Sequence, residues 1–131
     1  MPGRATAVRN GRELQNAVVK AASDLGLTAR KEVKVGRRLW GAERRIDVVA
    51  TEPETRLSLG IECKYQGGPG SAEEKIPATI NDMAAWPIRG ILVFSGDGFS
   101  QNMRSFLYST GQAIDLEDLD GWLKLYFGIS D

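Results

Sequence analysis

Residues 46–66 read IDVVATEPETRLSLGIECKYQ, and this stretch decides the fold. Two apolar segments flank Glu52-Pro53-Glu54, which has the composition of a tight turn. The second segment alternates as a strand with one buried face does. Its apolar set is Leu57, Leu59, Ile61, Cys63 and Tyr65, and its other set is Ser58, Gly60, Glu62, Lys64 and Gln66. The stretch therefore predicts two neighbouring strands with an apolar core face and a polar face that is open at Gly60.

The segments on either side alternate between helix and strand patterns. Apolar residues recur at helical spacing from Asn10 to Leu25, and 28–35 is rich in β-branched residues. After the glycine-rich break at 67–70, the sequence SAEE resembles a capping box that opens a helix toward Trp86, which Pro77 should kink or restart. The rest predicts a strand over 90–95, a helix over 100–109, a short strand over 112–116 and a helix over 116–127.

The resulting order, αβββαβαβα, indicates an α/β fold. A chain of 131 residues with 42% hydrophobic content has the size of one domain with its own core. We therefore expect a single domain over residues 1–131, with a core at about 10–95 and a C-terminal β-α extension at about 96–131.

The histidine and cysteine content excludes several classes of catalytic site. Histidine is absent, which excludes Ser-His-Asp and Cys-His nucleophilic sites and histidine-dependent zinc sites. Cys63 is the single cysteine, so no internal disulfide forms. Catalysis must rely on carboxylates, lysine, tyrosine or a metal.

No secretory signal pattern or membrane-spanning apolar run is present, so we expect a cytoplasmic protein of a bacterial, archaeal or phage-infected cell.

Charge is unevenly distributed although the net charge is zero. Residues 1–50 hold 11 Lys and Arg against 5 Asp and Glu, whereas residues 51–131 hold 6 against 12. Such asymmetry indicates one positive face able to follow phosphates, with chance clustering on solvated surfaces as the alternative.

The strand pattern places three functional groups together. Glu62 and Lys64 leave the same face of one strand, and Asp47 lies on the preceding strand. Paired through the turn, the two carboxylates approach each other and suit Mg²⁺ or Mn²⁺, with the backbone carbonyl of Cys63 as a further ligand. Lys64 would then orient the attacking water, stabilise the transition state or accept a proton. The alternative is a solvated strand face with cross-strand charge pairs.

The Glu-x-Lys pattern occurs three times. Glu32-Val33-Lys34 and Glu73-Glu74-Lys75 also match it. Only the copy at 62–64 follows an aspartate on an apolar strand and precedes a glycine-rich loop before a helix. The other two copies are therefore interpreted as incidental.

Further candidates surround this site. Glu13 borders the apolar stripe of the first helix and either reaches the metal or forms a capping box with Asn10. Gln66 continues the polar face and either holds a water or phosphate or caps the strand end. Cys63 is interpreted as a packed strand residue. A basic connection is predicted to bind DNA phosphates and stack a base: Arg37, Arg38, Trp40, Arg44 and Arg45. Trp40 is equally consistent with a core position.

Together these residues resemble the PD-(D/E)XK nuclease superfamily, which has the restriction-endonuclease-like fold. The resemblance covers about residues 10–95 as an αβββαβ core and implies a mixed central sheet flanked by helices. It implies that Asp47 and Glu62 bind the metal, that Lys64 is the catalytic lysine and that Glu13 is an additional helix carboxylate. Ile46 departs from the motif, because a proline precedes the aspartate there in the family pattern.

The resemblance implies a Mg²⁺-dependent DNA endonuclease that uses a metal-activated water. The stretch from Glu13 through Lys64 is also similar to archaeal-type Holliday junction resolvases, whereas 62–75 resembles small restriction-type or phage-encoded nucleases. We expect DNA as the substrate, a homodimer, no membrane partner and no organic cofactor, with Mn²⁺ able to replace Mg²⁺. The alternatives are a Holliday junction resolvase, an inactive nucleic-acid-binding subunit of the same fold, and a structural interaction domain.

Overall fold

The computed structural model describes residues 8–130 apart from 38–40, 42 and 69–70. The predicted order of helices and strands is confirmed. The elements are α1 (Gly11–Asp24), β1 (Thr28–Arg37), β2 (Glu43–Thr51), β3 (Ser58–Tyr65), the 3-10 helix η3 (Ser71–Lys75), α2 (Ile76–Met83), β4 (Arg89–Ser95), α3 (Gln101–Thr110), β5 (Ala113–Asp115), the 3-10 helix η4 (Leu116–Asp118) and α4 (Leu119–Phe127).

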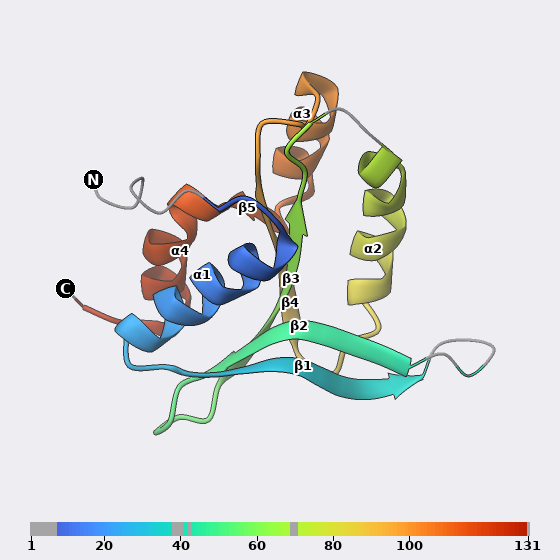
Figure 1. Cartoon of the computed structure of the whole chain (residues 1–131). Helices are drawn as coiled ribbons and strands as arrows, with labels where there is room; N and C mark the ends of the chain where they lie inside the picture. The colour runs from blue at the N-terminus through green and yellow to red at the C-terminus, as the bar shows by residue number, and fades with distance from the viewer. Residues whose placement is uncertain (1–7, 38–40, 42, 69–70, 131) are drawn as a thin grey trace.

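One mixed sheet organises the molecule. Its strand order is β1-β2-β3-β4-β5. The pairs β1/β2 and β2/β3 are antiparallel, whereas β3/β4 and β4/β5 are parallel. Figure 1 shows α1 and α4 on one face of the sheet and α2 and α3 on the other. The predicted mixed sheet flanked by helices is therefore confirmed.

Two predicted helices begin with a 3-10 segment, and the restart predicted at Pro77 is confirmed. The helix expected from residue 71 starts as η3 and restarts as α2 with Pro77 in its first turn, because proline is tolerated where the amide has no helical acceptor. The last helix likewise begins as η4, whose first turn is capped by Asp115. Among the described residues, no helix combines the length and apolar character that crossing a membrane requires.

The first core lies between the sheet and the pair α1 and α4. Leu14 and Val18 of α1 pack there against Ile61 of β3 and Leu123 of α4, and all four are fully buried. Leu59, Ile61 and Cys63 are buried as the alternation predicted. The prediction was wrong for Leu57, which precedes β3 and is 43% exposed, because the strand faces are defined only once the ladder has begun.

The second core lies under α2 and α3 and contains Trp86. Gly60 and Gly90 are partners in the β3/β4 ladder. A Cβ atom would lie 2.8 Å from the Trp86 ring at Gly60 and 2.6 Å from it at Gly90. The space expected beside the polar face at Gly60 is therefore filled by the indole, which packs directly on the backbone of both strands.

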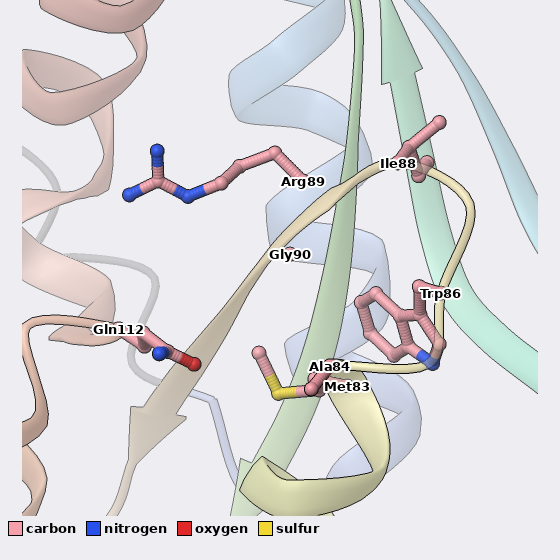
Figure 2. A pocket seen from close by; sticks show the side chains of 7 residues that line it. All are labelled: Met83, Ala84, Trp86, Ile88, Arg89, Gly90 and Gln112. Carbon is pink, nitrogen blue, oxygen red and sulfur yellow. The ribbon is translucent and has the colours of Figure 1, made fainter.

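A pocket of about 240 Å³ adjoins this indole at the start of β4. Its lining residues are Met83, Ala84, Trp86, Ile88, Arg89, Gly90 and Gln112. Figure 2 shows Trp86 and Met83 close to Gly90, with the side chains of Arg89 and Gln112 opposite them. None of the residues that the sequence singled out for catalysis lines this pocket.

The contact with Trp86 predicts that Gly90→Ala destabilises the protein. The new methyl group must displace a buried indole, so we expect the free energy of unfolding to fall by roughly 1–3 kcal/mol. Gly121→Ala in α4 is the matched control, since nothing lies within 4 Å of its Cβ position and alanine favours the helix. Urea unfolding measures both variants, and equal stability of Gly90→Ala and the unmodified protein would contradict the packing argument.

Candidate active site

The site forms where β2 and β3 separate. Their paired residues run from Thr51↔Ser58 to Val48↔Ile61, and the ladder stops there. Two residues beyond Ile61, the backbone N–H of Cys63 donates to Oδ2 of the Asp47 side chain at 2.9 Å, and not to a backbone carbonyl of β2. The Asp47 side chain thus takes the place of a strand carbonyl and is fixed against the backbone of the Glu62-Cys63-Lys64 segment.

The side chains of β2 on either side of Asp47 enter different cores. In a regular strand, residues two apart share a face. Ile46 and Val48 are both fully buried, but Ile46 packs in the core with Trp86 and Val48 packs in the core with Leu14. The regular alternation of β2 is therefore interrupted between Ile46 and Val48, at the point where β2 separates from β3.

Glu62 and Lys64 form an ion pair beside this separation. The Lys64 Nζ atom lies 3.4 Å from Oε2 of Glu62, and the side chains are 30% and 16% exposed for Lys64 and Glu62 respectively. Both groups therefore reach solvent while much of each side chain is covered. The Glu62 carboxylate and the Lys64 ammonium thus lie together, next to the Cys63 amide that binds Asp47, and the role of the three groups in a common site stays a prediction.

Asp47 is electrostatically unfavourable in this position. Its pKa is raised, first by burial and further by the Glu32 carboxylate, while the hydrogen bond from Cys63 and the Lys64 charge act in the opposite direction. A carboxylate whose charged form is disfavoured gains most from a cation. The oxygen donors of Asp47, Glu62 and the Cys63 carbonyl are of the type that Mg²⁺ and Mn²⁺ prefer.

The side chains do not form a ready-made metal cage. Within the described ranges, no group of three or more Asp, Glu, Cys or His side chains converges on one point. The Cys63 side chain is 9% exposed and packs in the first core. Burial, then Asp47 and Glu62, raise the pKa of its thiol far above the usual range, so Cys63 offers its backbone carbonyl and not a thiolate.

Glu13 contacts the two residues that precede α1, Arg9 and Asn10. Oδ1 of Asn10 accepts the N–H of Glu13 at 2.8 Å, so the predicted N-cap is confirmed. The Glu13 carboxylate accepts from the guanidinium of Arg9 at 2.8 Å and from the Arg9 backbone N–H at 2.9 Å. The hydrogen bond from the Arg9 side chain, followed by that from its backbone, lowers the pKa of Glu13. Its role as a metal ligand stays a prediction.

Gln66 joins two loops. It is 6% exposed, and its Nε2 donates to the Gly98 carbonyl at 2.9 Å. Its backbone N–H donates to Ser95 and its carbonyl accepts from Gly98. A Cβ at Gly98 would lie 2.3 Å from the Gly68 carbonyl, so the loops after β3 and β4 touch through their backbones. The structure thus gives Gln66 a supporting contact at the end of β3.

The predicted basic surface is divided. The Arg44 guanidinium binds Asp82 of α2 through Nη2 at 3.0 Å and is 17% exposed, so it ties β2 to α2. Arg45 is 50% exposed and lies 3.2 Å from Glu43. Arg38 and Trp40 lie outside the described residues, as does the side chain of Arg37. Of this set, the structure places Arg45 on the surface.

Glu32 is the residue near the site that sequence reasoning missed. It belongs to a Glu-x-Lys copy interpreted as incidental, yet it interacts electrostatically with Asp47. The constant register of Lys31↔Val48 and Val33↔Ile46 places it opposite Asp47. Local patterns contain no signal for this, because the register depends on the length and shape of the connection between β1 and β2.

Comparisons with known proteins identify related folds. The model of the PD-(D/E)XK nuclease superfamily domain matches residues 6–122. The crystal structure of protein AF1548, of unknown function, is 18% identical with a TM-score of 0.53, covering 77% of this chain and 55% of that one. Protein VC1899 from Vibrio cholerae is 16% identical with a TM-score of 0.57, covering 90% of this chain and 33% of that one. A search of curated proteins finds no match.

The two structural likenesses concern the fold alone. At 18% and 16% identity they carry no activity across. The chain spans about half the length of the first structure and a third of the second, as the coverages of 55% and 33% show.

The burial of Asp47 predicts an unusual effect of Asp47→Asn in metal-free protein. Asparagine still accepts the N–H of Cys63 but carries no charge. Because the folded-state pKa is raised, the carboxyl group stabilises the fold only while protonated, and this contribution is lost as pH rises through the folded pKa. We expect Asp47→Asn to raise the free energy of unfolding by roughly 0.5–2 kcal/mol at pH 7.5.

The gain in stability of Asp47→Asn should shrink as the pH is lowered below the unfolded pKa of aspartate, about 3.9. At such pH the aspartic acid and the asparagine that replaces it are both neutral. Urea unfolding with EDTA at pH 7.5 and at low pH measures the effect. Glu54→Gln, an exposed change in the turn between β2 and β3, is the control. A loss of stability in Asp47→Asn at pH 7.5 would rule out the electrostatic interpretation.

Proposed function

The chain belongs to the PD-(D/E)XK nuclease superfamily, and we propose that it is a Mg²⁺-dependent endonuclease that hydrolyses phosphodiester bonds in DNA. One observation carries the proposal. The Asp47 carboxylate accepts the N–H of Cys63, which brings Asp47 to the segment that bears Glu62 and Lys64. Two acids and one ammonium at a partly exposed strand edge match the groups that metal-dependent phosphodiester hydrolysis requires.

Enzymes of this superfamily typically use divalent metals, and the donors present suit one. Asp47, Glu62 and the Cys63 carbonyl would hold Mg²⁺, with Mn²⁺ able to replace it. When bound, the ion would polarise the scissile phosphate and lower the pKa of a coordinated water. The raised pKa of Asp47 supports this assignment, because a cation offsets the cost of its buried charge.

Lys64 is assigned the stabilisation of charge. Its ammonium group is held 3.4 Å from Glu62, so it is oriented before the substrate arrives. A positive group kept in place at the scissile phosphate stabilises the additional negative charge of the transition state. It also orients the attacking water through one of its N–H donors.

The substrate and the assembly form the finer part of the proposal. Arg45, which is 50% exposed on β2, would contact the phosphate backbone, joined by Arg37, Arg38 and Trp40. One site per chain cuts one strand, so cleavage of both strands calls for a homodimer. Arg44 would act indirectly, because its bond to Asp82 positions β2 against α2.

A catalytically inactive nucleic-acid-binding subunit is the second candidate. The contact of Glu13 with Arg9 favours it, since the helix carboxylate is engaged away from Asp47 and Glu62. Such a protein would bind DNA with equal affinity in Mg²⁺ and in EDTA.

The Lys64 assignment predicts that Lys64→Ala lowers DNA cleavage by about 10²–10³-fold, the scale of losing one preorganised electrostatic contact in a site. Lys75→Ala is the control, because it removes an exposed lysine from an incidental Glu-x-Lys match. The substrates are supercoiled plasmid, single-stranded DNA and a four-way junction, each with Mg²⁺, Mn²⁺ or EDTA.

Each outcome has a distinct meaning. Metal-dependent cutting that is lost in Lys64→Ala and kept in Lys75→Ala supports the nuclease. Preference for the four-way junction would assign a resolvase role. Binding without cutting of any substrate would favour the inactive subunit, and full activity of Lys64→Ala would refute the role of that lysine.

A further inference from the structure

Glu32 faces the site from the edge strand β1. It lies between the ladder pairs Lys31↔Val48 and Val33↔Ile46, which places it opposite Asp47 on β2. Its φ angle is +54°, although glutamate rarely adopts left-handed backbone geometry. The β1/β2 ladder is therefore distorted at the residue that faces Asp47.

Two contacts hold the Glu32 carboxylate in place. Its Oε2 accepts from Nε2 of Gln15 on α1 at 3.0 Å. Its Oε1 lies 3.6 Å from an Nη1 atom of Arg45 on β2. Glu32 thus links the helix and the two strands that border the site, and its side chain has a defined direction.

The position of this carboxylate is unfavourable in the absence of a cation. Its charge acts on Asp47 in the direction that disfavours the ionised form. The positive φ of Glu32 adds a steric cost, because its Cβ atom crowds the backbone in left-handed geometry. The bonds to Gln15 and Arg45 maintain two unfavourable features at one place, a combination typical of functional positions.

We propose that Glu32 is a positioning residue of the metal site, whose carboxylate, oriented by Gln15 and Arg45, adds negative potential at Asp47 and so strengthens the binding of the divalent cation. The inference rests on the proposed function, since it concerns the same site. It differs from a purely structural role, in which Glu32 only joins α1, β1 and β2.

Glu43 offers a matched control within the same strand pair. Its carboxylate also contacts Arg45, at 3.2 Å, and Lys34, at 3.3 Å. Glu43 pairs with Arg37 at the end of the β1/β2 ladder, four residues from Asp47 along β2. Glu32→Gln and Glu43→Gln therefore each remove one acidic partner of Arg45, while only the first removes charge that acts on Asp47.

The experiment is calorimetric titration of Mn²⁺ into the metal-free full chain, without DNA. We expect the dissociation constant of Glu32→Gln to rise about tenfold or more, the scale found for residues that support metal ligands. Glu43→Gln should bind Mn²⁺ within about twofold of the unmodified protein, and Asp47→Asn should lose binding. Urea unfolding of the same samples confirms that each variant is folded.

Arg45→Gln provides a second test that does not alter Glu32. Removing this cation leaves the Glu32 charge less compensated, while the hydrogen bond from Gln15 still orients the carboxylate, so Mn²⁺ binding should become a few-fold tighter. Equal Mn²⁺ affinity of the unmodified protein, Glu32→Gln and Arg45→Gln, with Asp47→Asn still deficient, would overturn the role of Glu32 and leave the nuclease proposal intact. No Asp47-dependent Mn²⁺ binding in the unmodified protein would overturn both.

Discussion

The hydrogen bond from the Cys63 N–H to Oδ2 of Asp47 is the contact on which the site depends. The β2/β3 ladder ends at the pair Val48↔Ile61, before it reaches Asp47 and Cys63. A buried amide without an acceptor would cost roughly 1–3 kcal/mol. A side-chain carboxylate that accepts this amide allows the strands to separate without that loss. The same bond fixes the distance of Asp47 from Glu62 and Lys64, so the break in the sheet and the assembly of the site are one structural event.

The electrostatic cost of Asp47 is offset by packing in the rest of the molecule. Asp47 is partly buried and faces the Glu32 charge, which disfavours its ionised form. Two packed cores surround the sheet, and the Trp86 indole lies on the paired glycines of β3 and β4. Gln66 holds the loops beyond these strands together. The site is therefore built on rigid elements whose packing offsets its local cost.

Sequence patterns predicted the elements well and their contacts less well. Alternation along β3 identified Leu59 and Ile61 as core residues and placed Glu62 with Lys64. The space at Gly60, by contrast, is filled by an indole 26 residues later in the chain, and Arg44 bonds to Asp82 on a distant helix. Both outcomes depend on which remote side chain reaches the position, and local periodicity contains no information about that choice.

The sequence by itself determined the order of helices and strands, the faces of β3 and the placement of Glu62 beside Lys64. These follow from local spacing, because the side-chain direction along a helix or strand repeats with a fixed period. Only the tertiary structure decided that Asp47 bonds to the Cys63 amide and that Glu32 lies opposite Asp47. Register, strand separation and side-chain pairing arise from contacts between segments, and the free energy of the whole packed chain selects among them.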